Sequence, residues 1–447
     1  MHELERLKAG QLAGTRRLRL ACGLTEFPRE IFDLADTLEI LDLTGNALTT
    51  LPDDLPRLHK LRVLFCSNNR FTTLPAVLGQ CPQLSMVGFK ANQIHTVPAG
   101  ALPHTLHWLI LTDNQIEQLP ATLGQCTGMR KLMLAGNRLR ALPTELGACL
   151  QLELLRISAN ALPELPPMLL ALPKLTWLAY AGNPFCDQLE ASILAASPHT
   201  DIPPVDWHQL TTEQVLGEGA SGTIYQAQMQ YPADGQAQAV AVKLFKGDIT
   251  SDGLPHHEMA ACLNAGQHPQ LVPVLGKVAG HPDGQSGMVL PLISPNCRNL
   301  AGPPSLDSCT RDVYAEGARF GLPTVMHIAQ GVASAAAHLH ARGLMHGDLY
   351  AHNILYDDAG QVFLGDFGAA SFLSLQDKQH AMALQRMEVR AFGCLLQELL
   401  EHCTVRPEQD RRLQTLADLR DACLHHMPGQ RPLFAAIEQV FVGLGRC

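Results

Sequence analysis

Apolar positions in the first half of the chain recur with a fixed period. Asparagines recur every 22 or 23 residues, and each lies within the pattern L-x-x-L-x-L-x-x-N-x-L or a close apolar variant. The set comprises Asn46, Asn69, Asn92, Asn114, Asn137, Asn160 and Asn183. A period of this length predicts a solenoid, in which each unit forms one short strand and buries its leucines only against neighbouring units.

The pattern resembles that of leucine-rich repeats. Leu38–Pro52 shows it in full, and Leu18–Pro28 is interpreted as a degenerate first repeat. The resemblance implies that each asparagine lies where the chain leaves the strand and bonds the backbone of adjacent turns in a ladder. The periodicity fades after Asn183, and residues 186–196 are predicted to form a capping helix. We therefore expect an α/β leucine-rich-repeat domain with caps over 1–196.

Strand alternation predicts which side chains of the repeats leave the leucine core. Two columns, four and six residues before each asparagine, should face outward on the concave surface. Their aromatic and large apolar members are Phe65, Met86, Trp108, Ile110, Met133 and Trp177. Contiguous exposed aromatic side chains are typical of a protein-binding surface. The alternative is a mildly apolar face that binds nothing.

The second half has a different pattern, with short alternating apolar runs broken by glycines. Leu216–Tyr225 predicts a strand, a glycine turn and a second strand, and the run V-A-V-K ends at Lys243. Glycines at such a turn let backbone N–H groups approach a phosphate without an intervening side chain. Met288–Ile293 predicts a further buried strand.

Two polar motifs follow these runs. H-G-D-L-Y-A-H-N occupies His346–Asn353, and D-F-G occupies Asp366–Gly368. Phosphoryl transfer needs a carboxylate that orients the attacking hydroxyl, and it needs an amide and a second carboxylate that hold Mg²⁺. Asp348, Asn353 and Asp366 supply these three groups.

The glycine turn, Lys243 and these two motifs together resemble the motifs of protein kinases, in the same order. The resemblance covers about 240 residues and implies an α+β bilobal fold over 207–447, with ATP and Mg²⁺ as cofactors. It implies that Asp348 is the catalytic carboxylate, that Asn353 and Asp366 bind the metal, and that Lys243 grips the phosphates and pairs with Glu258. The expected nucleotide-binding residues are Gly217, Glu218, Gly219, Gly222, Ile224, Ala241, Lys243, Leu290 and Leu355. The histidines next to Glu258, His256 and His257, are interpreted as exposed polar surface.

The chain departs from the kinase pattern in three places. Gly347 replaces the arginine that reads a phosphorylated activation loop, so activity should not require that modification. Tyr350 stands where serine/threonine kinases carry a lysine, and His352 could supply part of the missing charge. Only about twenty residues separate Gly368 from Glu388, and no A-P-E motif lies between them.

Composition limits the classes of partner. Residues 1–200 carry 17 Lys/Arg and 17 Asp/Glu, whereas residues 201–447 carry 16 and 25, which places the net charge of −9 in the second half. This balance argues against nucleic-acid or anionic-membrane binding. No run reaches the roughly 18 apolar residues of a membrane span, the Pro-rich linker at 197–206 included. The thirteen scattered cysteines are typical of reduced thiols, so a cytoplasmic location is expected.

These observations indicate a soluble, bacterial-type leucine-rich-repeat protein kinase. Its acceptor is expected to be a serine or threonine hydroxyl rather than tyrosine, and its repeats would bind a protein partner. Two alternatives remain open. One is a pseudokinase scaffold that binds nucleotide and acts as an adaptor. The other is a small-molecule kinase, which the short activation segment would suit. The presence of Lys243, Asp348, Asn353 and Asp366 favours an enzyme.

Overall fold

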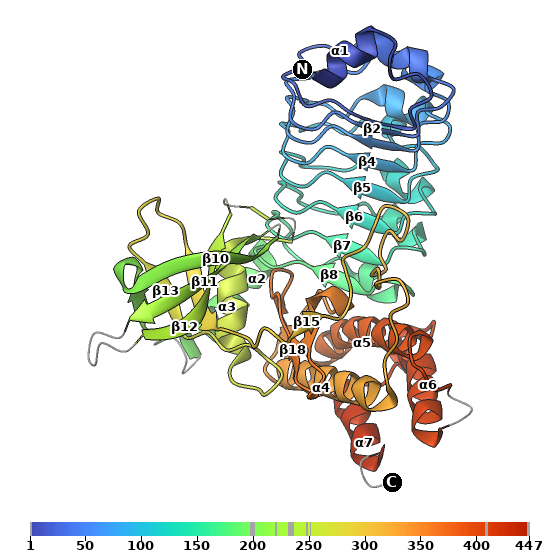
Figure 1. Ribbon diagram of the computed structural model, residues 1–447. Coiled ribbons are helices and arrows are strands. Elements are labelled where there is room, and N and C mark those ends of the chain that lie inside the picture. The colour runs from blue at the N-terminus through green and yellow to red at the C-terminus, as the bar shows by residue number, and fades with distance from the viewer. Residues whose placement is uncertain are drawn as a thin grey trace. The chain divides into compact units, whose positions relative to one another are not determined.

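The computed structural model describes residues 2–196, 202–219, 221–230, 237–246, 249–250, 252–406 and 410–444. The chain forms two compact units (Figure 1). The first comprises Met1–Leu175 and Asn183–Phe185, and the second comprises Thr176–Gly182 and Cys186–Cys447. Residues 197–201 of the expected linker lie outside the described residues.

The repeats form a parallel sheet of three-residue strands, as the period predicts. After helix α1 (His2–Lys8) the strands follow in chain order. They are β1 (Arg17–Arg19), β2 (Ile40–Asp42), β3 (Val63–Phe65), β4 (Met86–Gly88), β5 (Trp108–Ile110), β6 (Lys131–Met133), β7 (Leu154–Arg156) and β8 (Trp177–Ala179). The return segments contain short 3₁₀ turns, for example Ala76–Gln80 and Ala121–Gln125. The middle residue of each strand is a buried apolar side chain, so neighbouring units share one continuous core.

The expected asparagine ladder is present. Asn114 accepts a hydrogen bond from the Ile94 N–H at 2.9 Å and donates to the carbonyl oxygens of Phe89 and Leu111 at 2.9 and 3.0 Å. Each ladder asparagine is preceded by a residue with positive φ. These residues are Gly45, Asn68, Ala91, Asp113, Gly136, Ala159 and Gly182. The left-handed position aims the asparagine back into the turn, and the sequence pattern alone did not reveal it.

Of the six aromatic and large apolar side chains in the concave columns, all but one agree with the predicted direction. Phe65, Met86, Trp108, Ile110 and Met133 are partly exposed. Lys131 covers part of Trp108, with its Nζ 4.1 Å from the ring centroid. The prediction that Trp177 is exposed is wrong, because only 2% of it is accessible and its Nε1 donates to the Leu349 carbonyl oxygen at 3.1 Å. Alternation predicts where a side chain points, but it cannot predict a segment 172 residues away that covers it.

The second unit has two lobes. A six-stranded sheet has the order β10-β11-β12-β14-β13-β9, and helix α3 (Pro255–Ala265) packs beside it (Figure 1). The strands are β9 (Pro204–Asp206), β10 (Leu210–Glu218), β11 (Gly222–Gln230), β12 (Ala237–Phe245), β13 (Gly276–Ala279) and β14 (Gly287–Pro291). Alternate residues of β12, such as Val240 and Val242, are fully buried in the core of this lobe.

The other lobe is mainly helical. Its helices are α4 (Leu322–Ala341), α5 (Lys378–Glu401), α6 (Arg411–Cys423) and α7 (Phe434–Leu444), and α2 (Pro184–Ala196) is the predicted capping helix. The short strands are β15 (Arg298–Asn299), β16 (Leu344–Met345), β17 (Ile354–Tyr356), β18 (Val362–Leu364) and β19 (Ser371–Phe372). The loops from β16 to β17 and from β18 to β19 carry the two polar motifs.

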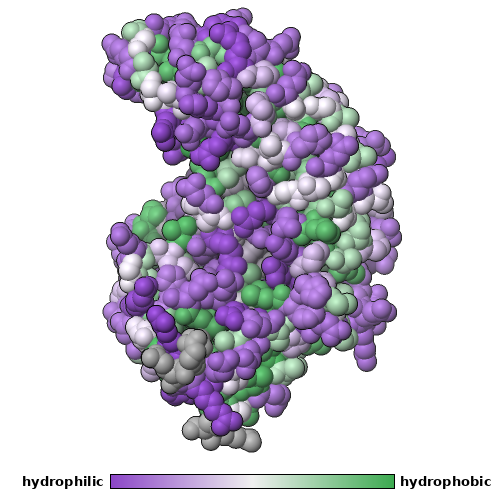
Figure 2. Space-filling model, turned by 90° about the vertical axis from the view of Figure 1, so that its right-hand side faces the viewer, coloured by the Kyte–Doolittle hydropathy of each residue, from purple (hydrophilic) through white to green (hydrophobic). Residues whose placement is uncertain are grey.

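Within the described ranges, no helix combines the length and the apolar character needed to cross a bilayer. On the face drawn in Figure 2, hydrophobic residues occur in small groups among hydrophilic ones.

Candidate active site

Lys243 and Glu258 form a buried ion pair. Strand β12 places Lys243 opposite Met288 of β14, and helix α3 places Glu258 within reach of the Lys243 ammonium. The Lys243 Nζ also lies 3.9 Å from Oδ1 of Asp366. Burial opposes the charge of Lys243, but Glu258 and Asp366 outweigh it and raise the pKa of this lysine. Burial raises the pKa of Glu258 to about 7.

The loop after β16 brings Asp348 and Asn353 together. Nδ2 of Asn353 donates to Oδ2 and to the backbone oxygen of Asp348, both at 2.9 Å. His346 is buried, and its Nε2 donates to the Gly365 carbonyl oxygen at 2.9 Å. The imidazole therefore ties this loop to the residue before the D-F-G motif.

Asp366 has an unusual backbone and an accessible carboxylate. Its φ is 56°, and 48% of its side chain is exposed. The Gly368 N–H donates to Oδ1 of Asp366 at 3.1 Å. A non-glycine residue in the left-handed region costs of order 1 kcal/mol or more, and such strain is concentrated at functional sites. The conformation keeps this carboxylate beside Lys243.

The three glycines of the turn have different roles. Gly217 pairs with Ile224 across β10 and β11, and the Gly219 N–H donates to the Gly222 oxygen at 2.9 Å. A Cβ at Gly217 or Gly219 would meet no atom within 4 Å, whereas one at Gly222 would lie 2.4 Å from the Leu244 oxygen. Gly222 is therefore required by strand packing, while the other two face open space.

The remaining residues expected at the nucleotide lie on the strands around this turn. Glu218 pairs with the exposed Lys246. Ala241 and Leu290 are paired between β12 and β14, as expected for one wall of a slot. Leu355 lies in a different sheet, on β17, opposite Phe363. Ala220, within the glycine segment, lies outside the described residues.

Glu388, on helix α5, holds the loop that carries Asp348. Its Oε1 accepts from the Gly347 N–H at 2.7 Å, and its Oε2 accepts from the His346 N–H at 3.3 Å and from His340 Nε2 at 2.7 Å. Burial opposes ionisation, but these hydrogen bonds and the charges of both histidines outweigh it. The pKa of Glu388 is therefore below its usual value.

The structure gives a physical reason for Gly347, which stands where the related motif has arginine. Its φ is 73°, and an added Cβ would lie 2.3 Å from the Ala369 oxygen and 2.9 Å from the Leu178 oxygen. Backbone approaches this position from two directions, so no larger residue fits without a shift. The sequence showed the missing arginine but not the close contact that excludes it.

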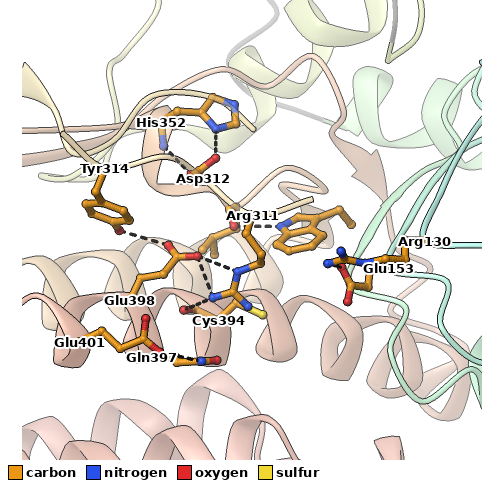
Figure 3. Close-up of polar contacts among 12 residues, drawn as sticks. Arg130, Glu153, Arg311, Asp312, Tyr314, His352, Cys394, Gln397, Glu398 and Glu401 are labelled. Atoms are coloured by element: carbon orange, nitrogen blue, oxygen red, sulfur yellow. Dashed lines mark hydrogen bonds and ion pairs between the residues drawn. The ribbon is translucent and has the colours of Figure 1, made fainter. Parts of the chain in front are cut away.

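His352 has a partner that sequence reasoning missed. Its Nδ1 donates to Oδ1 of Asp312 at 2.7 Å, and its N–H donates to Oδ2 at 2.9 Å (Figure 3). Burial lowers the pKa of His352, but Asp312, Asp348 and Asp366 outweigh it, so the pKa is raised. Arg311, which precedes Asp312, donates a hydrogen bond to the Glu398 carboxylate. Glu398 also accepts a hydrogen bond from the Tyr314 hydroxyl at 3.1 Å (Figure 3). No motif marks this segment.

Comparison with known proteins identifies both parts of the chain. Residues 210–393 match the family of protein tyrosine and serine/threonine kinases, and residues 36–94 match leucine rich repeats.

Curated relatives include the LRR receptor-like serine/threonine-protein kinase GSO2 of Arabidopsis thaliana, 29% identical over 37% of this chain and 13% of its own length. They also include CBL-interacting protein kinase 22 of Oryza sativa subsp. japonica, 30% identical over 36% of each chain. The serine/threonine-protein kinase mos of Xenopus laevis is 27% identical over 39% of this chain and 45% of its own. The matches thus span less than half of these relatives. Residues 210–393 form a domain of the protein kinase family, in a chain that also carries leucine-rich repeats.

Proposed function

We propose that the chain is an ATP-dependent protein kinase that transfers the γ-phosphate to a serine or threonine hydroxyl. The observation that carries the proposal is the arrangement of two sets of side chains in one unit. Lys243 is paired with Glu258 and lies 3.9 Å from Asp366, and Asn353 fixes the Asp348 carboxylate at 2.9 Å. A scaffold that only binds nucleotide has no need of the second set.

The donor set suits Mg²⁺ and a nucleotide. Mg²⁺ prefers hard oxygen ligands. Because the Asn353 amide nitrogen is used by Asp348, its amide oxygen is the group left for a metal, and the half-exposed Asp366 carboxylate supplies a second ligand. The open space in front of Gly217 and Gly219 admits phosphate oxygens close to the backbone.

Each residue then has a defined task. Asp348, oriented by Asn353, accepts a hydrogen bond from the attacking hydroxyl and directs it along the transfer axis. Lys243, held by Glu258, neutralises charge on the bound phosphates. His346 and Glu388 hold the loop so that Asp348 does not need to reorganise during the reaction. Mg²⁺, when bound, supplies electrostatic stabilisation of the transferring phosphoryl group.

The proposal is tested by Asp348→Asn in the full chain. Transfer of label from γ-labelled ATP to casein should fall about 10³-fold, about 4 kcal/mol of barrier. The matched control is Asp418→Asn, a substitution of an exposed acid on α6, which should leave transfer unchanged. Stabilisation by Mg-ATP in a thermal-shift assay should persist in both variants.

The result also separates the alternatives. If the wild type transfers no more label than Asp348→Asn does, while Mg-ATP still stabilises both proteins, the chain is a nucleotide-binding scaffold. ATP turnover that depends on Asp348, but without label on casein, on a Glu/Tyr copolymer or on the chain itself, would indicate a small-molecule acceptor.

For the repeats we propose a protein-binding role on the partly exposed columns, in a domain at 1–196 preceding the kinase domain at 207–447, in the cytoplasm. The supporting observation is the row Phe65, Met86, Trp108, Ile110 and Met133, without Trp177. Trp108→Ala should weaken the binding of a protein partner by about 2 kcal/mol. Its melting temperature should stay close to that of the control Leu150→Ala, which alters an exposed leucine outside the strands. Unchanged partner affinity would contradict this role.

A further inference from the structure

Strand β8 contacts the loop that carries the proposed catalytic carboxylate. The rings of Trp177 and Tyr350 are stacked, with centroids 4.1 Å apart and planes inclined by 10°. Nε1 of Trp177 donates to the Leu349 carbonyl oxygen at 3.1 Å. Leu349 and Tyr350 directly follow Asp348, and both aromatic side chains are buried. The indole thus restrains the backbone next to Asp348 by two independent contacts.

The same strand continues into a second contact, with the segment after D-F-G. The Tyr180 N–H donates to Oγ of Ser371 at 3.2 Å, and the Tyr180 hydroxyl donates to the Phe372 carbonyl oxygen at 2.9 Å. Burial raises the pKa of Tyr180, so this phenol stays protonated and remains a donor. Ser371 is fully buried, so it is not accessible to modification in this conformation.

A third contact reaches helix α3. Oε2 of Glu190, on α2, lies 3.1 Å from Nε2 of His257. Both side chains are largely buried, so the interpretation of His257 as exposed surface is wrong. His257 immediately precedes Glu258, the partner of Lys243. Helix α2 is therefore linked to the buried ion pair through two adjacent residues of α3, His257 and Glu258.

We propose that Trp177, Tyr180 and Glu190 form an internal clamp that positions the catalytic loop and α3 in place of a phosphorylated activation segment. The catalytic part of this inference rests on the proposed kinase function. Gly347 stands where the related motif has the arginine that reads a phosphate, and its position is approached by the backbone of Leu178 of β8. The clamp residues are positioning residues, because they act through Asp348, the segment after Asp366, and Glu258.

Packing alone would predict a different outcome from positioning. If the three residues only stabilise the fold, their removal lowers the melting temperature and reduces the active fraction, which leaves KM unchanged for every variant. Positioning predicts two separable effects. Trp177 contacts the loop of Asp348, so its loss should lower kcat. Glu190 contacts the helix of Glu258, so its loss should raise the KM for ATP.

The test uses the full chain with three substitutions and one control. Trp177→Ala should lower kcat for transfer to casein by about tenfold or more with KM for ATP within about twofold. Trp177→Phe keeps a ring for stacking and should recover part of that loss. Glu190→Gln should raise KM for ATP by about threefold or more with little change in kcat. The control Phe71→Leu weakens a buried aromatic pair in the first unit and should change neither parameter.

Hydrogen exchange supplies a readout that does not depend on activity. Amides of residues 346–353 and 369–373 should exchange at least about tenfold faster in Trp177→Ala than in wild type and Phe71→Leu. Equal exchange in all three would overturn the clamp, as would a proportional loss of kcat in all variants with KM unchanged. A third result is faster exchange in Trp177→Ala together with a wild-type protein that transfers no phosphate. It would support the clamp and refute the kinase function.

Discussion

The repeats and the kinase domain differ in how far apart along the sequence their bonded residues lie. In the repeats, Asn114 accepts a hydrogen bond from the Ile94 N–H, twenty residues away. Each of the other ladder asparagines accepts a corresponding hydrogen bond from the preceding unit. In the kinase domain, His340 pairs with Glu388, 48 residues away, and Trp177 bonds to Leu349, 172 residues away. The contacts of a periodic fold can therefore be predicted from the period of its sequence, whereas those of a site built from distant segments cannot.

The difference also determines how damage should spread. A ladder asparagine supports one turn and its neighbour, so its loss is local. Glu388 supports two backbone N–H groups of the loop that carries Asp348 and a histidine of another helix, so its loss should reach the whole lobe.

Glu388→Gln should cost about 3 kcal/mol of unfolding free energy. The substitution keeps the size of the side chain but replaces one acceptor oxygen by an amide donor. That donor must face a backbone N–H of His346 or Gly347, or the ring of His340. Chemical denaturation followed by a probe in α5 measures the change. A loss below about 1 kcal/mol would show that the loop is held mainly by other contacts.

The same residue gives a pH signature. Since the folded-state pKa of Glu388 is below the usual 4.5, its contribution is present above that value and is lost as the pH falls through the folded-state pKa. The stability difference between wild type and Glu388→Gln should therefore shrink as the pH decreases below about 4.5. A difference that stays constant over this range would contradict a charge-dependent role.

Asn114→Ala should cost about 2 kcal/mol in the repeats. The change leaves the Ile94 N–H and the carbonyl oxygens of Phe89 and Leu111 without their side-chain partner. Hydrogen exchange should increase in the two adjacent units and not elsewhere. Faster exchange throughout the first unit would mean that the array unfolds as one block, and the contrast with the kinase domain would be weaker.

Ala91→Gly should have the smallest effect, a gain of up to about 1 kcal/mol. Ala91 has a φ of 53° just before a ladder asparagine, a conformation that is strained for alanine and open to glycine. The gain is reduced by the extra freedom of glycine in the unfolded chain. The control is Ala47→Gly, one residue after a ladder asparagine, which should only lose stability. Thermal melts of both variants give the comparison, and a loss for Ala91→Gly would refute the strain argument.

Sequence reasoning succeeded where residue identity and spacing carry the information. The repeat strands follow from a period of 22 or 23 residues, and the asparagine ladder was implied by the resemblance to leucine-rich repeats. The pairing of Lys243 with Glu258 was implied by the resemblance to protein kinases, and the structure contains it. In each case the residue types and their spacing along the chain are sufficient to identify the positions.

The same reasoning failed where the environment is supplied by another segment. Strand alternation gave Trp177 the correct direction, but the covering residue, Tyr350, lies far along the chain. Asp312 and Glu190 were missed because one acid in an irregular loop or on a short helix has no distinguishing pattern. The requirement for Gly222 was assigned to phosphate approach, although the Leu244 oxygen demands it.

The contacts of β8 bear on how such a protein can be divided or recombined. By sequence, the natural place to separate the two functions is the Pro-rich stretch at 197–206. By contact, Thr176–Gly182 already belongs with the kinase domain. A gene fusion made at the Pro-rich stretch would give the kinase domain a foreign final repeat, and with it a foreign residue against Tyr350. An exchange made before Thr176 would carry Trp177 along, so the unit of inheritance for this kinase domain begins inside the last repeat.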